Sequence, residues 1–151
     1  MNNNPNVVSN NPNLRINEIE SMEKILHKEL SYKLIGLLFK VHKELGHFRN
    51  EKQYADYFEK LLKEAEIKYV REYRFDDSQY GMKKVRCVCD FVIDDKIILE
   101  FKTKNFITKE DYYQIKRYLV TLNLDLGIIV NFRQIRLAPK RVLNSMSSIR
   151  I

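Results

Sequence analysis

Two neighbouring stretches near the middle of the chain, residues 85–93 and 97–102, each have one wholly apolar set of alternate positions, whereas the other set carries the polar residues. β-Branched and aromatic residues crowd both stretches, as is typical of strands, and Asp94-Asp95-Lys96 between them predicts a tight turn. We therefore predict a β-hairpin. The apolar side of its first strand, which carries Cys89 and Phe91, is expected to face the same core as the apolar side of the second.

The number of residues in the turn decides which side chains share a face of this hairpin. A three-residue loop places Phe91 opposite Leu99 and Asp90 opposite Glu100, whereas a two-residue loop puts the two carboxylates on opposite faces. Because both apolar faces must reach one core, we expect a loop with an odd number of residues, such as the three of Asp94-Asp95-Lys96. Asp90, Glu100 and Lys102 then share one face of a nearly buried sheet. Their expected neighbours on that face are Val88, Val92 and Ile98.

Before the hairpin, apolar residues recur at helical spacing in two segments. Ser31 is expected to cap a helix that ends at Gly46, and Asn50 to cap a second helix that reaches about Glu66. Residues 67–75 alternate like a strand. The first 14 residues are rich in Asn and poor in large apolar groups, so we predict a disordered tail over 1–14, a charged extension with some helical character over 15–30, and one domain over 31–151.

After the hairpin, Thr108 and Asp111 fit a capping box for a helix that runs to about Leu122. Residues 125–132 read as a short buried strand, and the strand–helix–strand order predicts that it pairs in parallel with residues 97–102. Residues 135–142 are a candidate edge strand that Pro139 restricts. The order of elements predicts an α/β sandwich around a mixed sheet.

The chain carries 27 Lys and Arg against 20 Asp and Glu, a net charge of +7, which favours an anionic partner such as nucleic acid. Cys87 and Cys89 lie two apart on one strand, so we expect neither a disulfide between them nor a metal site built on sulfur. Reduced thiols favour an intracellular location. No stretch is long and apolar enough to suggest a membrane span, and the N-terminus lacks the apolar run of a signal peptide.

Two carboxylates and an ammonium in apolar surroundings cost free energy unless they are paired or bind a metal. Asp90 and Glu100 at cross-strand distance can hold Mg²⁺ or Mn²⁺, whose charge offsets their mutual repulsion. Lys102 beside them can position a water or stabilise charge on a phosphate. The alternative is an ordinary ion pair of Lys102 with Glu100 on an exposed face of the hairpin.

Asp90 followed by Glu100-Phe101-Lys102 resembles the D…E-x-K signature of the PD-(D/E)XK nuclease superfamily. Gln114-x-x-x-Tyr118 resembles the Q-x-x-x-Y motif of its RecB-like members. The run from Ser31 to Val142 is similar to the GxxExxY family through V-H-K-E-L-G, E-K-Q-Y and L-G-I-I-V-N-F, although Phe48 stands where that family's motif has Gly. The resemblance implies a restriction-endonuclease-like α-β-β-β-α-β core, with a mixed sheet flanked by helices.

By position, the resemblance implies Asp90 and Glu100 as metal ligands, with the backbone carbonyl of Phe101 as a third. Lys102 would orient or activate the attacking water, and Glu51 would be a helix-borne acid that reaches the same site. Gln114 and Tyr118 would hold the site or the nucleic-acid strand. If the protein is a nuclease, four basic residues next to the site are expected to contact phosphates: Lys104, Lys109, Lys116 and Arg117.

The leading hypothesis is a nuclease that depends on Mg²⁺ or Mn²⁺ and acts on DNA more readily than on RNA. Two other classes stay open: a module that binds nucleic acid without cutting it, and a protein-interaction scaffold on the same fold. The acid–acid–lysine set favours cleavage, because a pure binder has no need of carboxylates that face a polyanion. A homodimer or a protein partner is also left open.

Overall fold

The computed structural model describes residues 27–78 and 81–144, so the expected tail and most of the expected extension lie outside the described residues. The elements run in the order α2 (Lys28–Leu45), α3 (Glu51–Glu64), β1 (Tyr69–Asp77), β2 (Val85–Ile93), β3 (Ile97–Lys102), α4 (Lys109–Leu122), β4 (Leu126–Asn131) and β5 (Lys140–Leu143). None of the helices in these ranges is long and apolar enough to cross a membrane.

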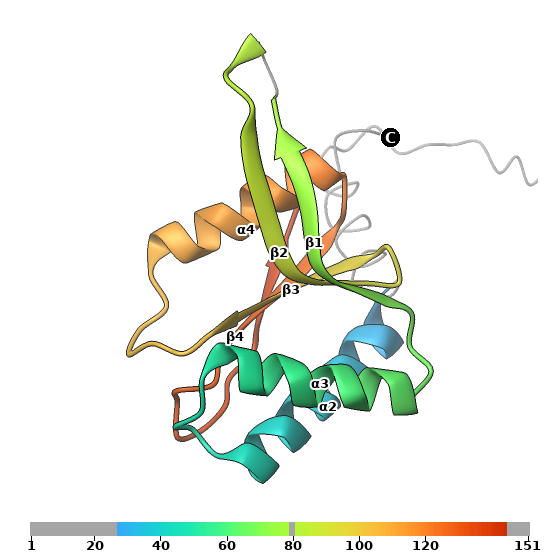
Figure 1. The fold of residues 1–151 in the computed structure, drawn as a ribbon, viewed down its shortest axis with the longest axis vertical. Helices are drawn as coiled ribbons and strands as arrows, with labels where there is room; N and C mark the ends of the chain where they lie inside the picture. The colour runs from blue at the N-terminus through green and yellow to red at the C-terminus, as the bar shows by residue number, and fades with distance from the viewer. Residues whose placement is uncertain (1–26, 79–80, 145–151) are drawn as a thin grey trace, which may run out of the picture.

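The five strands form one sheet in the order β1-β2-β3-β4-β5. Only the β3–β4 pair is parallel, and α4 makes the crossover between these two strands. The predicted mixed sheet and its α-β-β-β-α-β core are therefore confirmed. Figure 1 shows α2 and α3 on one side of the sheet and α4 on the other, while β1 and β2 continue together beyond the other strands.

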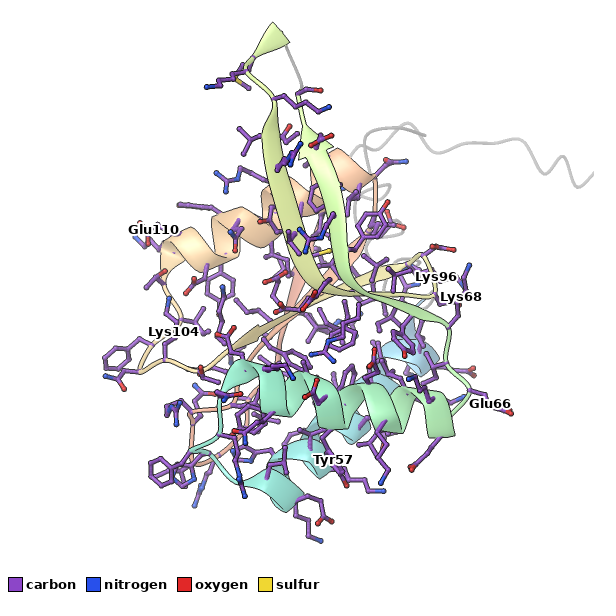
Figure 2. All side chains as sticks on the ribbon, in the orientation of Figure 1. Tyr57, Glu66, Lys68, Lys96, Lys104 and Glu110 are labelled. Carbon is purple, nitrogen blue, oxygen red and sulfur yellow. The ribbon has the colours of Figure 1, made fainter. Side chains whose placement is uncertain are left out.

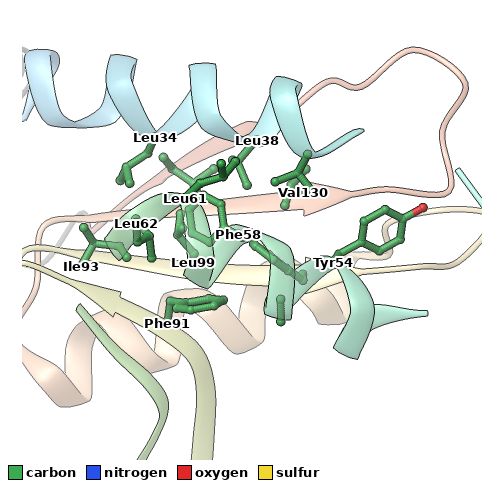
Figure 3. Packing of buried hydrophobic residues seen from close by; sticks show 14 of the residues in the cluster. Leu34, Leu38, Tyr54, Phe58, Leu61, Leu62, Phe91, Ile93, Leu99 and Val130 are labelled. Atoms are coloured by element: carbon green, nitrogen blue, oxygen red, sulfur yellow. The ribbon is translucent and has the colours of Figure 1, made fainter. Parts of the chain in front are cut away.

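Each face of the sheet has its own apolar core. The larger core lies under α2 and α3, and Figure 3 shows how side chains from both helices meet those of the sheet. Its central members include Leu34, Leu38, Phe58, Leu62, Phe91, Leu99 and Val130. The smaller core lies under α4 and includes Cys89, Val92, Ile98, Ile115, Tyr118 and Leu119. Burial of both faces explains why β3 and β4 are apolar almost throughout.

The register of the central hairpin is the predicted one. Phe91 pairs with Leu99 and Ile93 pairs with Ile97, so the connection is the three-residue turn 94–96. Asp94 and Asp95 both adopt a positive φ, 50° and 55°, a conformation that Asp tolerates better than most residues.

The expectation that Cys89 and Phe91 face one core is wrong. Phe91 lies in the core under α2 and α3, whereas Cys89 lies in the core under α4. The same change of face occurs on β1, where Arg71 packs toward α3 and Tyr73 joins the α4 side. Between them Glu72 has a φ of 51°, and a left-handed residue inside a strand interrupts the alternation of side chains.

This change of face also removes Val88 from the expected apolar surroundings of the carboxylates. Val88 pairs with Arg74 of β1, beyond the Phe91–Leu99 pair where the ladder between β2 and β3 ends, and 43% of its surface is exposed. Val92 and Ile98 are buried, as expected.

The helix ends agree with the predictions in two of three cases. Asn50 and Thr108 each accept from the third residue of their helix in a complete capping box. Ser31 is not a cap, because α2 already begins at Lys28 and the Ser31 hydroxyl donates back to the Lys28 carbonyl. The last strand begins only after Pro139, so it is shorter than residues 135–142.

Candidate metal centre

The two predicted carboxylates lie where β2 and β3 separate. The backbone ladder between these strands runs from the Ile93–Ile97 pair to the Phe91–Leu99 pair. Beyond it, Glu100 Oε1 accepts from the backbone N–H of Asp90 at 3.1 Å, and Asp90 Oδ2 accepts from the N–H of Phe101 at 2.7 Å. Each carboxylate therefore accepts a hydrogen bond from a backbone N–H where a strand–strand hydrogen bond would otherwise form. These two hydrogen bonds fix both side chains at the branch point, the place where β2 and β3 separate.

The surroundings of these two groups oppose their negative charge. Glu100 is only 5% exposed, and burial together with repulsion from Asp90 raises its pKa to about 8. Burial also raises the pKa of Asp90, although the N–H of Phe101 and the ammonium of Lys102 act in the opposite direction. A cation between the two carboxylates would offset both effects.

Glu51, the first residue of α3, lies close to Asp90 and Lys102 although it comes from a different part of the chain. Burial and the charge of Asp90 raise its pKa, while Lys102 and the backbone N–H of Thr103 lower it. The Asn50 capping box sets where α3 begins, and thus where this carboxylate points into the site. The structure therefore brings together Glu51, Asp90, Glu100 and Lys102, as the resemblance implied.

Lys102 is paired with a residue to which the sequence assigned only a capping role. Its ammonium lies 3.9 Å from Asp111 Oδ1, and Asp111 Oδ2 also accepts from Lys104 Nζ at 2.7 Å and from the N–H of Thr108. The alternative of an exposed ion pair with Glu100 is wrong, because Glu100 is buried and the ion pair of Lys102 is with Asp111. Only the position of Asp111 in the capping box marks it in the sequence.

An open pocket of about 210 Å³ leads to the site from between α3 and the first two strands. Its lining comprises Glu51, Lys52, Ala55, Arg71, Glu72, Asp90 and Phe101. Glu72 is a further carboxylate that no motif in the sequence marks, and its charge contributes to raising the pKa of Asp90. Nothing in its spacing distinguishes Glu72 from an outward-facing residue of an ordinary strand.

The two residues of the predicted Q-x-x-x-Y motif lie on α4 in different environments. Gln114 is half-buried. Tyr118 is 7% exposed, and its ring packs edge-on against Phe75 at 5.0 Å between centroids. Burial raises the pKa of the Tyr118 hydroxyl to about 12, so this group stays protonated. Tyr118 thus lies in the core under α4, where its ring is covered.

The four predicted phosphate-contacting residues fall into two kinds. Lys109, Lys116 and Arg117 are exposed on α4, and no ion pair within the described ranges involves them. Lys104 lies in the loop between β3 and α4 (Figure 2) and is already paired with Asp111.

The donor atoms at the branch point suit a hard divalent cation. Within residues 27–78 and 81–144, no three side chains of His, Cys, Asp or Glu converge as a ready-made metal cluster. Asp90 and Glu100 each use one oxygen for a backbone N–H, which leaves the other oxygen for a cation. Mg²⁺ needs few protein ligands because it keeps much of its water shell, so one oxygen from each of two carboxylates is the kind of donor set that it takes.

A protein-family model described as the PD-(D/E)XK nuclease superfamily matches residues 28–142. Among solved structures, the one titled "Crystal structure of SSO0001" has 18% sequence identity and a TM-score of 0.47, with 78% of this chain and 70% of that chain covered. No curated protein matches the chain.

Proposed function

The chain belongs to the PD-(D/E)XK nuclease superfamily, and from this premise we propose that it hydrolyses phosphodiester bonds with Mg²⁺ or Mn²⁺, on DNA more readily than on RNA. One observation carries the proposal. Asp90 and Glu100 are fixed at the branch of β2 and β3, and Glu51 and Lys102 lie near enough to shift their titration. A fold that needed no cation would have little reason to bury two acids together.

In this proposal Asp90, Glu100 and the carbonyl of Phe101 hold the cation. When bound, the cation supplies a Lewis acid that neutralises charge on the phosphate. Lys102 holds the attacking water in line, and the Asp111 carboxylate limits where the ammonium can move. Glu51 contributes a third acidic group on the open side of the site, where a proton can leave.

We also propose that the chain belongs to the GxxExxY family within this superfamily. The Glu of that motif is Glu51, at the site. Its Tyr is Tyr54, whose hydroxyl donates to the Gly46 carbonyl and accepts from the N–H of Arg49, so it closes the loop between α2 and α3. Gly46, with a φ of 75°, supplies the backbone freedom that Phe48 lacks, which explains how the loop forms without Gly at 48.

Gln114 and Tyr118 are proposed to support the site from α4. Because Tyr118 is buried against Phe75, we assign it to holding α4 on the sheet rather than to stacking on a base. The phosphate backbone is proposed to run over the exposed cations of α4, which are Lys109, Lys116 and Arg117. Lys104, half-buried in the loop before α4 and paired with Asp111, is proposed to lie nearest the site.

The second candidate function is a nucleic-acid-binding module that does not cut. It is favoured by the observation that no three His, Cys, Asp or Glu side chains in the described part of the chain form a ready-made metal cluster. Such a module would show salt-dependent affinity without any requirement for a metal.

The test is incubation of the purified protein with labelled single- and double-stranded DNA and RNA in Mn²⁺, Mg²⁺ or EDTA. Cutting should require the metal and disappear in Lys102→Ala. Lys96→Ala is the matched control, because Lys96 lies in the hairpin turn at the opposite end of β3. Cutting that persists in EDTA or in folded Lys102→Ala would contradict the proposal. Metal-independent binding without cutting would establish the second candidate.

A further inference from the structure

Two phenylalanines beside the candidate site stand almost fully in water. Phe48 is 80% exposed and Phe106 is 78% exposed, although large apolar side chains gain free energy when they are buried. Phe48 lies three residues before Glu51, in the loop between α2 and α3. Phe106 lies four residues after Lys102, in the loop between β3 and α4.

The end of β4 holds these two loops next to each other. Asn131 accepts from the N–H of Lys104 at 3.2 Å and donates to its carbonyl at 2.6 Å, which ties down the loop that carries Phe106. Arg133 donates to the carbonyls of His47 at 2.8 Å and Arg49 at 3.4 Å, on either side of Phe48. Figure 2 shows Lys104 at the end of the molecule where α3 begins.

Hydrogen bonds therefore hold both loops in conformations that leave the rings of Phe48 and Phe106 exposed. Phe48 is flanked by the two residues that Arg133 holds, and its ring lies against that of His47, with centroids 4.1 Å apart. Phe106 is flanked by Lys104 and by the Thr108 cap of α4. A ring held out by a braced backbone loses little conformational entropy when a ligand covers it.

The charges around these rings favour one kind of occupant. Phe48 is followed by Arg49, and Phe106 shares its loop with Lys104. Flat aromatic rings interleaved with cations suit single-stranded nucleic acid, because bases stack on the rings while the cations meet the phosphates. In a duplex the base faces are covered by their neighbours, so exposed rings beside the site would gain little from it.

We propose that Phe48 and Phe106 form a stacking platform for unpaired bases, which directs the candidate site to single-stranded nucleic acid. The inference rests on the proposed function, since it takes the substrate to be nucleic acid.

The test measures equilibrium binding of a labelled single-stranded DNA by fluorescence anisotropy in EDTA, so that no cutting occurs. Phe48→Ala and Phe106→Ala should each weaken binding about tenfold, the order found for base–aromatic stacking. Substitution by Trp should retain affinity, while Leu, which is apolar but not flat, should not. Tyr32→Ala is the matched control, because Tyr32 is 79% exposed on α2 but lies near the opposite end of that helix from Phe48.

A second probe separates stacking from phosphate contact. On a strand of the same length with abasic sites, both Ala variants should bind as the parent does, because no base remains to stack. Equal affinity of parent and Ala variants for the normal strand would overturn the proposal, even if the protein cuts DNA. A change of oligomeric state in the variants would overturn it too, in favour of a protein interface. Stacking-dependent binding without cutting would uphold the platform while the nuclease proposal failed.

Discussion

At the scale of single residues, the surroundings of the Glu100 carboxyl strongly oppose its negative charge. Its pKa is raised from 4.5 to about 8, so the folded state holds this proton more tightly than the unfolded state does. The free energy of unfolding should therefore fall as the pH rises from about 5 to about 8 without metal, by roughly 2–4 kcal/mol. Urea denaturation in EDTA across this window measures it, and Glu100→Gln should reduce the fall.

Asp90 should contribute in the same direction, because its pKa is also raised. Asp90→Asn should therefore be more stable than the parent without metal, and should lose the stabilisation that Mn²⁺ gives the parent. Glu44→Gln, on the exposed surface of α2, serves as the control for removing one acid.

For the pH prediction, a Glu100→Gln variant with the same pH dependence of stability as the parent would show that Glu100 titrates normally.

Asp111 offers a test of whether the position of Lys102 matters as well as its charge. Asp111→Asn keeps an oxygen for the N–H of Thr108 but loses the attraction for the ammonium groups of Lys102 and Lys104. We expect cutting to fall about tenfold in kcat, because a displaced ammonium holds the water poorly. Thr108→Ala is the matched control, since it removes the cap at a cost of about 1 kcal/mol but leaves the pair with Lys102.

Equal losses of kcat in the two variants would mean that Asp111 acts only through the stability of α4. A rise in KM with an unchanged kcat would place Asp111 in substrate binding.

At the scale of elements, Glu72 marks the position on β1 at which the side chains of β1 and of its partner β2 switch from the core under α2 and α3 to the core under α4. A non-glycine residue with a φ of 51° costs about 1 kcal/mol relative to Gly, so Glu72→Gly should raise the free energy of unfolding by up to that amount. Glu72→Gln keeps the strained backbone and removes only the charge that acts on Asp90. Urea denaturation of the three proteins at one pH separates strain from charge. A Gly variant less stable than the parent would show that the conformation carries no strain.

The elements also show which features a sequence can reveal. The odd number of residues in the turn 94–96, the Asn50 cap and the Thr108 capping box follow from local rules, and the structure confirms them. The change of face at Glu72 and the pairing of Lys102 with Asp111 depend on how distant segments meet. The sequence places Cys89 and Phe91 on one face by regular alternation. In the structure they face different cores, because this part of β2 packs against α4 at Cys89 and against the α2 and α3 side at Phe91.

At the scale of the whole molecule, the net charge of +7 makes salt dependence the broadest test of nucleic-acid binding. Affinity for a single strand should fall linearly with salt on logarithmic axes, by a slope of about 0.7 for each phosphate contact. Lys116→Ala should remove about one such contact, because Lys116 is exposed and no ion pair in the described ranges involves it. The loss should be similar for every strand sequence.

Lys104→Ala should change the slope less than Lys116→Ala does, because Lys104 must leave Asp111, 2.7 Å away, before it can meet a phosphate. Lys33→Ala, near the start of α2, is the control for the loss of one exposed positive charge. Anisotropy titrations at several salt concentrations give the slopes. An equal effect of Lys33→Ala and Lys116→Ala would mean that the strand feels only the total charge and follows no path over α4. A larger effect of Lys33→Ala would move the path to the face that carries α2, away from the candidate metal centre.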